Sequence, residues 1–309
     1  MYAVETYQLS KVYGDKKVVN EINLQVKKGS IFGFLGKNGA GKSTFINMIT
    51  GLTNPTSGSY TLLPDQGSSA DKLRSRIGVL PDYSTFYDDL TALGHLKYFS
   101  RILGLKVSKS HMEDLLKKVG LEDAINQKAK KFSFGMKKKL GLAQALINEP
   151  DLLFLDEPTS GVDANAILNI HEIIQDIAAQ GTTIFLTSHN LDEVEKLCDE
   201  IAIMDQGTIK TQGTMAQLRH DYQSNITVHI KHSEIQADVE TSLNQELKAY
   251  GSDVEVSSKH TDLVVSSEQT IAAINRLYLK KDIDIFRIEV NEPTLEEIFL
   301  STGENKQSA

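Results

Sequence analysis

The chain has 309 residues, of which 40% are hydrophobic and 24% are charged, a composition that is ordinary for a globular protein long enough to hold two domains. Its net charge of −8 argues against a general nucleic-acid-binding protein, and its single cysteine, Cys198, excludes an internal disulfide and fits a reducing cytosol. No uncharged apolar run approaches the length of a membrane span, and the first ten residues lack the basic start and apolar core of a signal peptide.

The first 80 residues are predicted to be rich in β-strands, with one helix. Two strands, VETYQLSKVY and KVVNEINLQVKKGS, precede a short apolar strand at residues 30–35. The string GKNGAGKS follows at residues 36–43 and matches G-x-x-x-x-G-K-[ST], the phosphate-binding loop. Its glycines allow the turns that bring amide groups close to an anion, and a helix from Ser43 onward would direct its positive end at the loop. The alternative is a glycine-rich turn without a ligand.

Residues 83–148 are predicted to be helical, because LTALGHLKYFSRILG and HMEDLLKKVGLED place apolar residues at helical spacing. A basic run flanks the segment FSFGM at residues 132–136 and consists of Lys128, Lys130, Lys131, Lys137, Lys138 and Lys139. This run could favour the phosphates of a facing nucleotide or lipid headgroups. The simpler interpretation is a solvated helix start.

The string LLFLDEP at residues 152–158 is an apolar strand that ends in two adjacent carboxylates, Asp156 and Glu157. Two uncompensated charges at the end of a buried strand would be costly, so they need a partner. Asp156 fits a partner to hydrated magnesium, and Glu157 fits the residue that orients or deprotonates an attacking water. Ordinary solvated acids are the alternative, but the phosphate-binding loop favours nucleoside triphosphate hydrolysis.

Residues 151–218 show the alternation of strands and helices that is typical of a parallel sheet with crossovers. His189 follows the apolar strand TTIFLTS, and Asn190 is a good N-cap for the helix that begins after it. IAIMDQGTIKTQGT predicts a hairpin with its turn at residues 205–207.

Residues 223–309 carry 8 basic and 15 acidic side chains, so most of the acidic excess lies in this part of the chain. The predicted order is strand, helix, strand, strand, helix, strand, which is the split βαβ pattern. Capping boxes are predicted at Ser233 with Gln236 and at Thr294 with Glu297. We find no nucleophile or metal constellation in this region.

The order of these motifs resembles one family over residues 4–218, the ATP-binding cassette (ABC) transporter ATPases. PTSGVD at residues 158–163 is similar to the family's D-loop, which implies a role for Asp163, and His189 is similar to its switch histidine. Together with Glu157 and Lys42, His189 would then be catalytic. Tyr13 resembles the aromatic residue that stacks on adenine, although a surface tyrosine on a turn is the alternative. The resemblance implies these nucleotide-binding residues: Tyr13, Gly36, Lys37, Asn38, Gly39, Ala40, Gly41, Lys42, Ser43 and Thr44.

The implied fold class is α/β. A P-loop NTPase core of the ABC ATPase type, with an antiparallel β subdomain and a helical subdomain at about residues 83–148, would occupy residues 1–220. A small α+β, ferredoxin-like accessory domain of the kind found on drug-export cassettes would occupy residues 223–303, and residues 304–309 would form a tail.

Three positions depart from the family's usual pattern. The signature loop, usually Leu-Ser-Gly-Gly-Gln, corresponds to FSFGM, which retains its serine and second glycine. Phenylalanine resists backbone conformations that glycine accepts, so altered local geometry is expected there. Asp82 stands at the Q-loop glutamine, and Lys37 stands where proline is usual. The implied signature residues are Ser133, Phe134, Gly135 and Met136, and the implied Mg²⁺ ligands are Ser43, Asp156 and Asp82.

The resemblance implies an ATP- and Mg²⁺-dependent subunit of an exporter that drives a separate transmembrane subunit. It would be cytoplasmic and peripheral on the inner face of the cell membrane. Two cassettes, in a homodimer or heterodimer, would pair head to tail, so that the signature loop acts on the partner's nucleotide. The groove for a coupling helix would lie near residues 83–96, with Phe86, Tyr87 and Leu90 as contacts or as core residues. The alternatives are a non-transport ABC ATPase acting on nucleic acid or ribosomes, and a low-turnover regulatory subunit.

Overall fold

The computed structural model describes residues 1–64, 70–83, 85–221, 226–291 and 294–304, without the side chains of residues 70–71 and 301–304. The chain divides into two compact units, Met1–Met215 and Ala216–Ala309. Each unit has its own cluster of buried hydrophobic residues. The division falls at the start of helix α8 (Met215–Asp221), a few residues before the boundary expected near residue 220. The expected tail at residues 304–309 lies almost wholly outside the described residues.

The first unit is built on a six-stranded sheet in the order β5-β6-β7-β3-β8-β9. All neighbours in this sheet are parallel except β8 and β9. Every residue of the three central strands is buried, as expected for parallel strands that are covered on both faces. The strands are β3 (Ile31–Leu35), β5 (Ile77–Leu80), β6 (Leu152–Asp156), β7 (Thr183–Ser188), β8 (Glu200–Asp205) and β9 (Thr208–Gly213).

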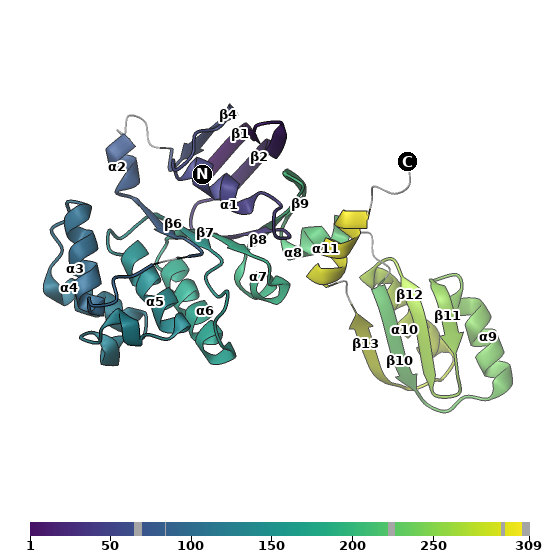
Figure 1. Ribbon diagram of the computed structural model, residues 1–309. Coiled ribbons are helices and arrows are strands. Elements are labelled where there is room, and N and C mark those ends of the chain that lie inside the picture. Colours follow the sequence, from purple (N-terminus) through teal and green to yellow (C-terminus); the bar gives the residue numbers. More distant parts are fainter. Residues whose placement is uncertain (65–69, 84, 222–225, 292–293, 305–309) are drawn as a thin grey trace. The chain divides into compact units, whose positions relative to one another are not determined.

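A second sheet of the first unit is antiparallel, in the order β2-β1-β4. Its strands are β1 (Tyr2–Tyr13), β2 (Lys16–Lys27) and β4 (Ser57–Leu62). Helix α1 (Lys42–Ile49) lies between this sheet and the six-stranded sheet (Figure 1). Its Phe45 ring lies 4.9 Å from that of Phe34 in β3 and 6.0 Å from that of Phe185 in β7, measured between centroids. These aromatic contacts fix the helix against the strand that carries the loop before it.

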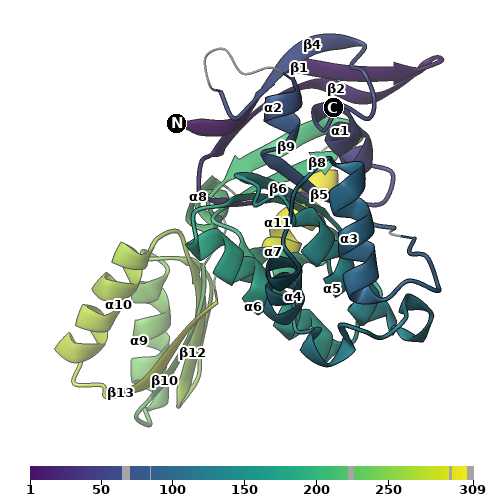
Figure 2. The same cartoon turned by 90° about the vertical axis from the view of Figure 1, so that its left-hand side faces the viewer.

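The other face of the six-stranded sheet is covered by helices, as Figures 1 and 2 show for α5, α6 and α7. The prediction of a helical region at residues 83–148 is confirmed, because α3, α4 and α5 lie there and pack on one another. Helix α2, a single short turn, was not predicted. The bounds are α2 (Ala70–Arg74), α3 (Ala92–Ile102), α4 (Lys109–Lys118), α5 (Phe134–Ala145), α6 (Ala164–Ala179) and α7 (Leu191–Leu197), with 3₁₀ turns at Glu122–Ala124 and Ala129–Lys131.

The local signals in residues 190–213 are confirmed. The Asn190 side chain accepts a hydrogen bond from the Glu193 amide and caps α7. The β8–β9 hairpin turns at Asp205, Gln206 and Gly207, and the last two of these residues have φ angles of 47° and 80°. Left-handed conformations of this kind are what a tight hairpin requires.

The second unit has the predicted order of elements. Its four-stranded antiparallel sheet has the order β11-β12-β10-β13, and the buried residues of α9 and α10 join the core formed with it. The bounds are β10 (Ile226–His232), α9 (Ala237–Leu247), β11 (Ser252–Val256), β12 (His260–Val265), α10 (Glu268–Lys280), β13 (Ile285–Asn291) and α11 (Leu295–Glu304).

One of the two capping boxes in this unit is correct. The amide and side chain of Thr294 exchange hydrogen bonds with Glu297, at 3.0 Å and 3.3 Å. The box predicted at Ser233 and Gln236 was wrong, because α9 begins later, with Gln236 as an N-cap that makes no side-chain hydrogen bond. The Ser233 hydroxyl instead accepts a hydrogen bond from the Asp284 amide, so a tertiary contact replaces the local one.

Within the described residues, no helix combines the length and the apolar character that crossing a bilayer requires.

Candidate active site

The glycine-rich loop at residues 36–43 joins the end of β3 to the start of α1. A Cβ atom on Gly36 would lie 2.5 Å from the carbonyl oxygen of Met204, and one on Gly41 would lie 2.6 Å from that of Val18. Gly41 also has a φ of 112° and is the N-cap of α1, which no side chain caps. The first amide groups of the helix are therefore left to an anion, as in phosphate-binding loops generally.

A pocket of about 330 Å³ opens over this loop. The loop and the first turn of α1 form one wall of it, two residues at the start of β2 form another, and two acidic residues line the rest. The lining residues are Lys16, Val18, Asn38, Gly39, Ala40, Gly41, Lys42, Ser43, Thr44, Asp82 and Glu157. Segments far apart in the sequence thus meet at the carboxyl ends of the parallel strands, where ligands bind in open α/β sheets.

Lys42 lies at the base of the pocket with only 7% of its surface exposed. Its Nζ atom donates a hydrogen bond of 2.6 Å to the Gly36 carbonyl oxygen and lies 3.9 Å from Glu157 Oε1. Burial lowers the pKa of the Lys42 ammonium, while the nearby charges of Glu157, Asp156 and Asp82 oppose that shift. The ammonium is held by acceptors that more strongly charged phosphate oxygens can replace.

The two carboxylates at the end of β6 have different surroundings. Asp156 is buried and accepts a hydrogen bond of 2.5 Å from the Thr187 hydroxyl of β7. Glu157 faces the pocket, and its Oε2 atom lies 2.7 Å from Nδ1 of His189. Burial raises the pKa of the Glu157 carboxyl, although the hydrogen bond to His189 opposes the rise. A raised pKa makes the Glu157 carboxylate a stronger proton acceptor than an ordinary glutamate.

The residues present fit a magnesium ion. Ser43 supplies a hydroxyl at the start of α1, and Asp156 supplies a carboxylate at the end of β6, both of them hard oxygen donors. Among the described residues there is no group of three or more His, Cys, Asp or Glu side chains that could hold a metal by itself. This is the donor set expected where Mg²⁺ is completed by phosphate oxygens and water. Asp82 is already engaged, because its Oδ1 atom lies 3.4 Å from the Lys138 ammonium.

The signature segment begins helix α5. Ser133 caps the helix by accepting a hydrogen bond of 3.2 Å from the Met136 amide. Phe134 is the first helical residue and has no left-handed backbone angle, so the altered geometry expected from losing a glycine is absent. Its ring lies against Gly161 of the D-loop. A Cβ atom added to Gly161 would lie 3.0 Å from the Phe134 ring. None of the signature residues lines the pocket of its own chain.

Lys138, which we had placed in an exposed basic run, is buried with 4% of its surface exposed. Its Nζ atom donates to the carbonyl oxygens of Asp82 at 2.7 Å and of Glu157 at 2.8 Å. The rest of the run differs, since Lys128 and Lys130 are exposed and form ion pairs with Asp89. Helical spacing could have identified the buried lysine, because Gly135, Lys138 and Leu142 share the buried side of α5.

The D-loop and the switch segment are joined by Glu193, a fully buried carboxylate that the sequence did not reveal. Glu193 accepts hydrogen bonds from Thr159 at 2.8 Å and from Ser188 at 2.6 Å, and its Oε1 atom lies 3.1 Å from Nε2 of His171. Asp163 caps α6 by accepting from the Ala166 amide. Glu193 thereby holds Thr159, two residues after Glu157, and Ser188, the residue before His189.

The remaining predicted residues lie at the edge of the site. Tyr13 ends β1 with 51% of its surface exposed, and Lys11 Nζ lies 5.0 Å from its ring centroid. It does not line the pocket, although Lys16 and Val18 of the same hairpin do. Lys37 is exposed, as expected for an outward-pointing side chain. The structure brings together the phosphate-binding loop, Asp82, Glu157 and His189, and leaves Tyr13, Ser133 and Asp163 outside the pocket lining.

Fold and site together define a P-loop nucleoside triphosphatase, and comparison with known proteins identifies its family. Residues 19–160 match the family model of the ABC transporter, and residues 213–302 match that of the C-terminal domain of ATP-binding proteins similar to DrrA1-3. The chain is 33% identical over 299 residues to the bacitracin transport ATP-binding protein BcrA of Bacillus licheniformis, covering 96% of both chains. It is 35% identical over 306 residues to the Nod factor export ATP-binding protein I of Rhizobium etli, covering 97% of this chain and 93% of the relative.

The chain therefore belongs to the family of ABC transporter ATP-binding proteins. Its first unit also has the fold of a dimeric bacterial ABC transporter cassette, MJ0796, with a TM-score of 0.62 and 22% identity. That alignment covers 69% of this chain and 98% of the solved structure.

Proposed function

We propose that this chain binds and hydrolyses MgATP as the ATP-binding subunit of an ABC exporter and so drives a separate transmembrane subunit. One observation carries the proposal. Lys42 of the phosphate-binding loop and Glu157 after β6 line one pocket with 3.9 Å between them, and His189 after β7 lies 2.7 Å from Glu157. A cation, a proton acceptor and a residue that orients it are the parts that phosphoryl transfer to water requires.

Each residue has a distinct task in this mechanism. The loop amides and Lys42 bind the β- and γ-phosphates and offset their charge. Ser43 and Asp156 would hold the magnesium ion, which supplies charge neutralisation on the triphosphate when bound. Glu157 orients the attacking water and accepts its proton, and the raised pKa of its carboxyl suits that role. His189 fixes the direction of the Glu157 carboxylate through their hydrogen bond.

The position of the signature segment supports action across a dimer. Ser133, Phe134, Gly135 and Met136 lie at the N-terminal end of α5 and do not line the pocket of their own chain. The hydroxyl and amides at that end suit the phosphates of a second cassette, homologous or identical, that faces it. ATP would then close the pair and hydrolysis would reopen it.

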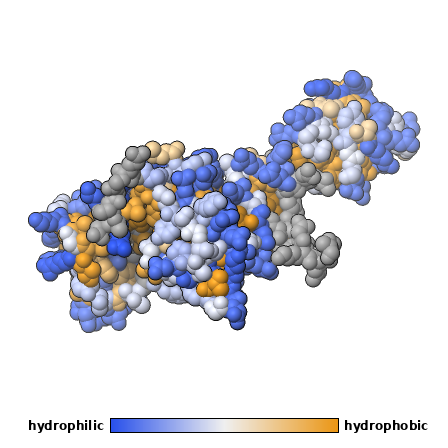
Figure 3. Space-filling model, turned by 90° about the horizontal axis from the view of Figure 1, so that it is seen from above, coloured by the Kyte–Doolittle hydropathy of each residue, from blue (hydrophilic) through white to orange (hydrophobic). Residues whose placement is uncertain are grey.

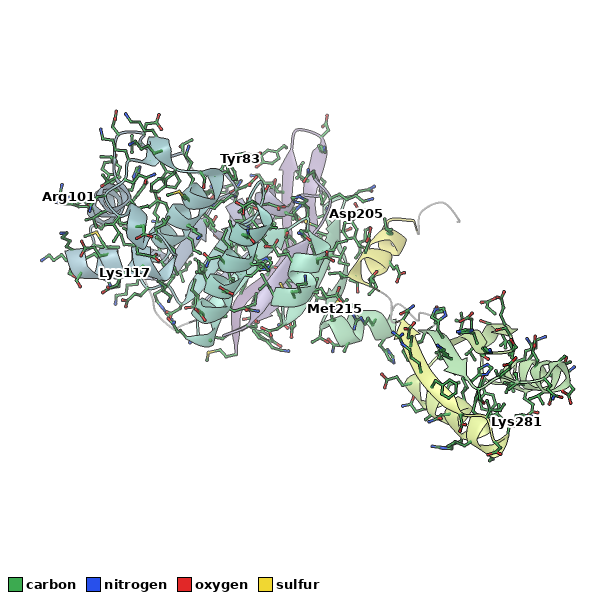
Figure 4. The ribbon with its side chains drawn as sticks, turned by 90° about the horizontal axis from the view of Figure 1, so that it is seen from below. Tyr83, Arg101, Lys117, Asp205, Met215 and Lys281 are labelled. Atoms are coloured by element: carbon green, nitrogen blue, oxygen red, sulfur yellow. The ribbon has the colours of Figure 1, made fainter. Side chains whose placement is uncertain are left out.

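A groove of about 460 Å³ on the helical region suits the membrane subunit. Its lining is largely apolar and includes Val79, Phe99, Ile102, Leu103, Leu105 and Ala145. Ile102 and Leu103 remain 61% and 57% exposed, which marks an interaction surface. Figure 3 shows hydrophobic surface beside hydrophilic surface at the end of the unit where α3 lies, and Figure 4 shows Arg101 at that end.

This groove lies at the C-terminal end of α3, further along than the stretch near residues 83–96 that the sequence indicated. Phe86, Tyr87 and Leu90 do not line it. In the stretch that the sequence indicated, Tyr83 (Figure 4) and Tyr87 are exposed by 83% and 55%. We propose that a cytoplasmic helix of the membrane subunit docks in the groove. The named relatives serve bacitracin transport and Nod factor export, so the cassette does not by itself specify the cargo.

The test is the variant Glu157→Gln, with Glu172→Gln as a matched control on the exposed face of α6. Loss of the proton acceptor should lower ATP turnover by roughly 10²- to 10⁴-fold, while ATP binding persists. Light scattering should then detect an ATP-bound dimer of Glu157→Gln, and Glu172→Gln should behave as the wild type. Turnover by Glu157→Gln at the wild-type rate would remove Glu157 from its role.

A further inference from the structure

The buried ammonium of Lys138 is not used by the mechanism above. It comes from α5, the helix that the signature segment begins, and donates to main-chain carbonyl oxygens of both Asp82 and Glu157. Nζ of Lys138 also lies over the Phe134 ring, 5.8 Å from the ring centroid. Lys138 does not line the nucleotide pocket. Lys138 therefore lies outside the pocket lining but forms hydrogen bonds with two residues, Asp82 and Glu157, that belong to the lining.

The main chain at Glu157 needs to be held in place. Glu157 has a φ of 51°, a left-handed conformation that is uncommon for residues other than glycine. Such conformations persist where the surrounding structure imposes them. Here the Glu157 amide donates to the Thr187 carbonyl oxygen at 3.2 Å, and the Glu157 carbonyl oxygen accepts from Lys138 at 2.8 Å and from the Ser160 amide at 3.3 Å. Lys138 supplies the shortest of these bonds.

Charge is the second part of the argument. Three carboxylates, those of Asp82, Asp156 and Glu157, surround two buried ammonium groups, those of Lys42 and Lys138. Lys42 faces the triphosphate site, so Lys138 is the cation left to balance Asp82, whose Oδ1 atom it approaches to 3.4 Å. Without Lys138, the Asp82 carboxylate would line the pocket as an uncompensated negative charge and repel a triphosphate.

We propose that Lys138 is a positioning residue for ATP hydrolysis, which holds the Glu157 main chain in its active orientation and cancels the charge of Asp82. The inference rests on the proposed ATPase function. It also gives a physical reason why an aspartate is tolerated at position 82, since α5 of the same chain provides its counter-charge.

The experiment compares Lys138→Met, which keeps the length of the buried stem, with Asp82→Asn and with the double variant. Lys139→Met is the control, because this lysine is the next residue of α5 and its ammonium points toward Gly120 instead. The kcat and KM for MgATP are measured for each, with circular dichroism to establish that the proteins are folded.

We expect Lys138→Met to lower kcat at least 20-fold, because Glu157 loses an anchor, and to raise KM at least fivefold, because Asp82 is left unpaired. Adding Asp82→Asn should restore KM to within twofold of the wild type while kcat stays low. Lys139→Met should change neither constant by more than twofold. If Lys138→Met only destabilised the fold, kcat would fall because less enzyme is active, and KM would stay at the wild-type value. Asp82→Asn would then have no raised KM to restore.

A kcat for Lys138→Met within threefold of the wild type would overturn the positioning role, and a KM that Asp82→Asn leaves unchanged would overturn the charge balance. If Lys138→Met does not fold, Lys138→Gln enters the same comparison under the same criteria. Absence of ATP binding and turnover in the wild type would instead contradict the proposed function, so the two failures are distinguishable.

Discussion

The two units bury polar groups in contrasting ways. In the first unit several of the buried polar groups are charged, and one of them, Lys42, lines an open pocket together with the partly buried Glu157. In the second unit a hydrogen-bonded network lies inside the core, formed by His232, Thr261 and Tyr278. The Tyr278 hydroxyl donates to Thr261 at 2.7 Å, and the two His232 nitrogens lie 3.1 Å from the Thr261 hydroxyl and 2.9 Å from the Ser233 carbonyl oxygen.

The contrast separates a site from a structural network. Burying a charge is costly unless it is paired, so charged groups that face a pocket retain a free-energy gain for a ligand that pairs with them better. The polar groups of the network in the second unit already have hydrogen-bond partners inside the core. The burial of a polar group therefore does not by itself identify a functional site. A buried charged group that faces a pocket does.

Glu193 gives the largest expected effect and would sharpen this contrast, because it is a buried carboxylate with no access to the nucleotide pocket. Glu193→Ala leaves the buried donors Thr159 and Ser188, and the partly buried His171, without their acceptor. We expect a loss of about 3 kcal/mol in the free energy of unfolding, and a melting temperature lower by roughly 6–12 °C. Asp192→Ala, an exposed position in the same helix, should change it by less than about 2 °C. Equal effects of the two changes in calorimetric melting would contradict the account.

Tyr278 in this network predicts a dependence of stability on pH in the alkaline range. Burial raises the pKa of Tyr278 to about 12, above its ordinary value of 10.0. The folded state therefore keeps a proton that the unfolded state loses above pH 10. This contribution is complete below pH 10 and is lost as the pH rises toward 12, at about 1.4 kcal/mol per pH unit.

Urea unfolding at pH 8 and pH 11 tests this dependence. Between these values the wild type should lose about 1 kcal/mol more stability than Tyr278→Phe, which has no phenol to titrate at that position. At pH 8 the same variant should itself be about 1 kcal/mol less stable, for want of the hydrogen bond to Thr261. Tyr250→Phe, whose side chain is only half-buried, should keep the wild-type dependence. A parallel loss in wild type and Tyr278→Phe would show that Tyr278 ionises normally.

The smallest expected effect concerns helix starts. The start of helix α11 is capped by the side chains of Thr294 and Glu297, whereas α1 begins at Gly41 without a side-chain cap. Thr294→Ala should destabilise the start of α11 by about 1 kcal/mol, and hydrogen exchange at the Glu297 amide should accelerate roughly fivefold. Thr294→Ser keeps the hydroxyl and should exchange as the wild type does. Unchanged exchange in Thr294→Ala would mean that the box does not hold the helix.

The sequence predicted features that depend on local pattern. The buried strands, the turn before Thr208 and the Asn190 cap follow from short-range chemistry, and the phosphate-binding loop is recognisable because only glycine fits at two of its positions. Sequence reasoning missed features that depend on tertiary contacts. Lysine is usually exposed, which favours a solvated interpretation of Lys138. Its helical spacing points to the buried side of α5, but the carbonyl oxygens of Asp82 and Glu157 that accept its hydrogen bonds become evident only in the fold.

Two other misses have the same origin. Glu193 lies in the acidic first turn of α7, where a solvated helix start is the natural interpretation, but the strand end at Ser188 and the D-loop residue Thr159 enclose it. Ser233 has the spacing of a capping box, but its hydroxyl accepts a hydrogen bond from the Asp284 amide instead. In each case a hydrogen bond to a residue distant in the chain replaces the structure that the local sequence favours.

Calorimetric titration of ATP in the presence of Mg²⁺ is the most direct test of the central claim that the loop at residues 36–43 holds a triphosphate. The wild type should bind one ATP per chain with a Kd between about 1 μM and 1 mM, the range typical of enzyme substrates. Lys42→Met, which removes the ammonium that faces the pocket, should weaken binding at least tenfold. A folded wild-type sample that takes up no nucleotide, or a Lys42→Met variant that binds as tightly as the wild type, would contradict the account.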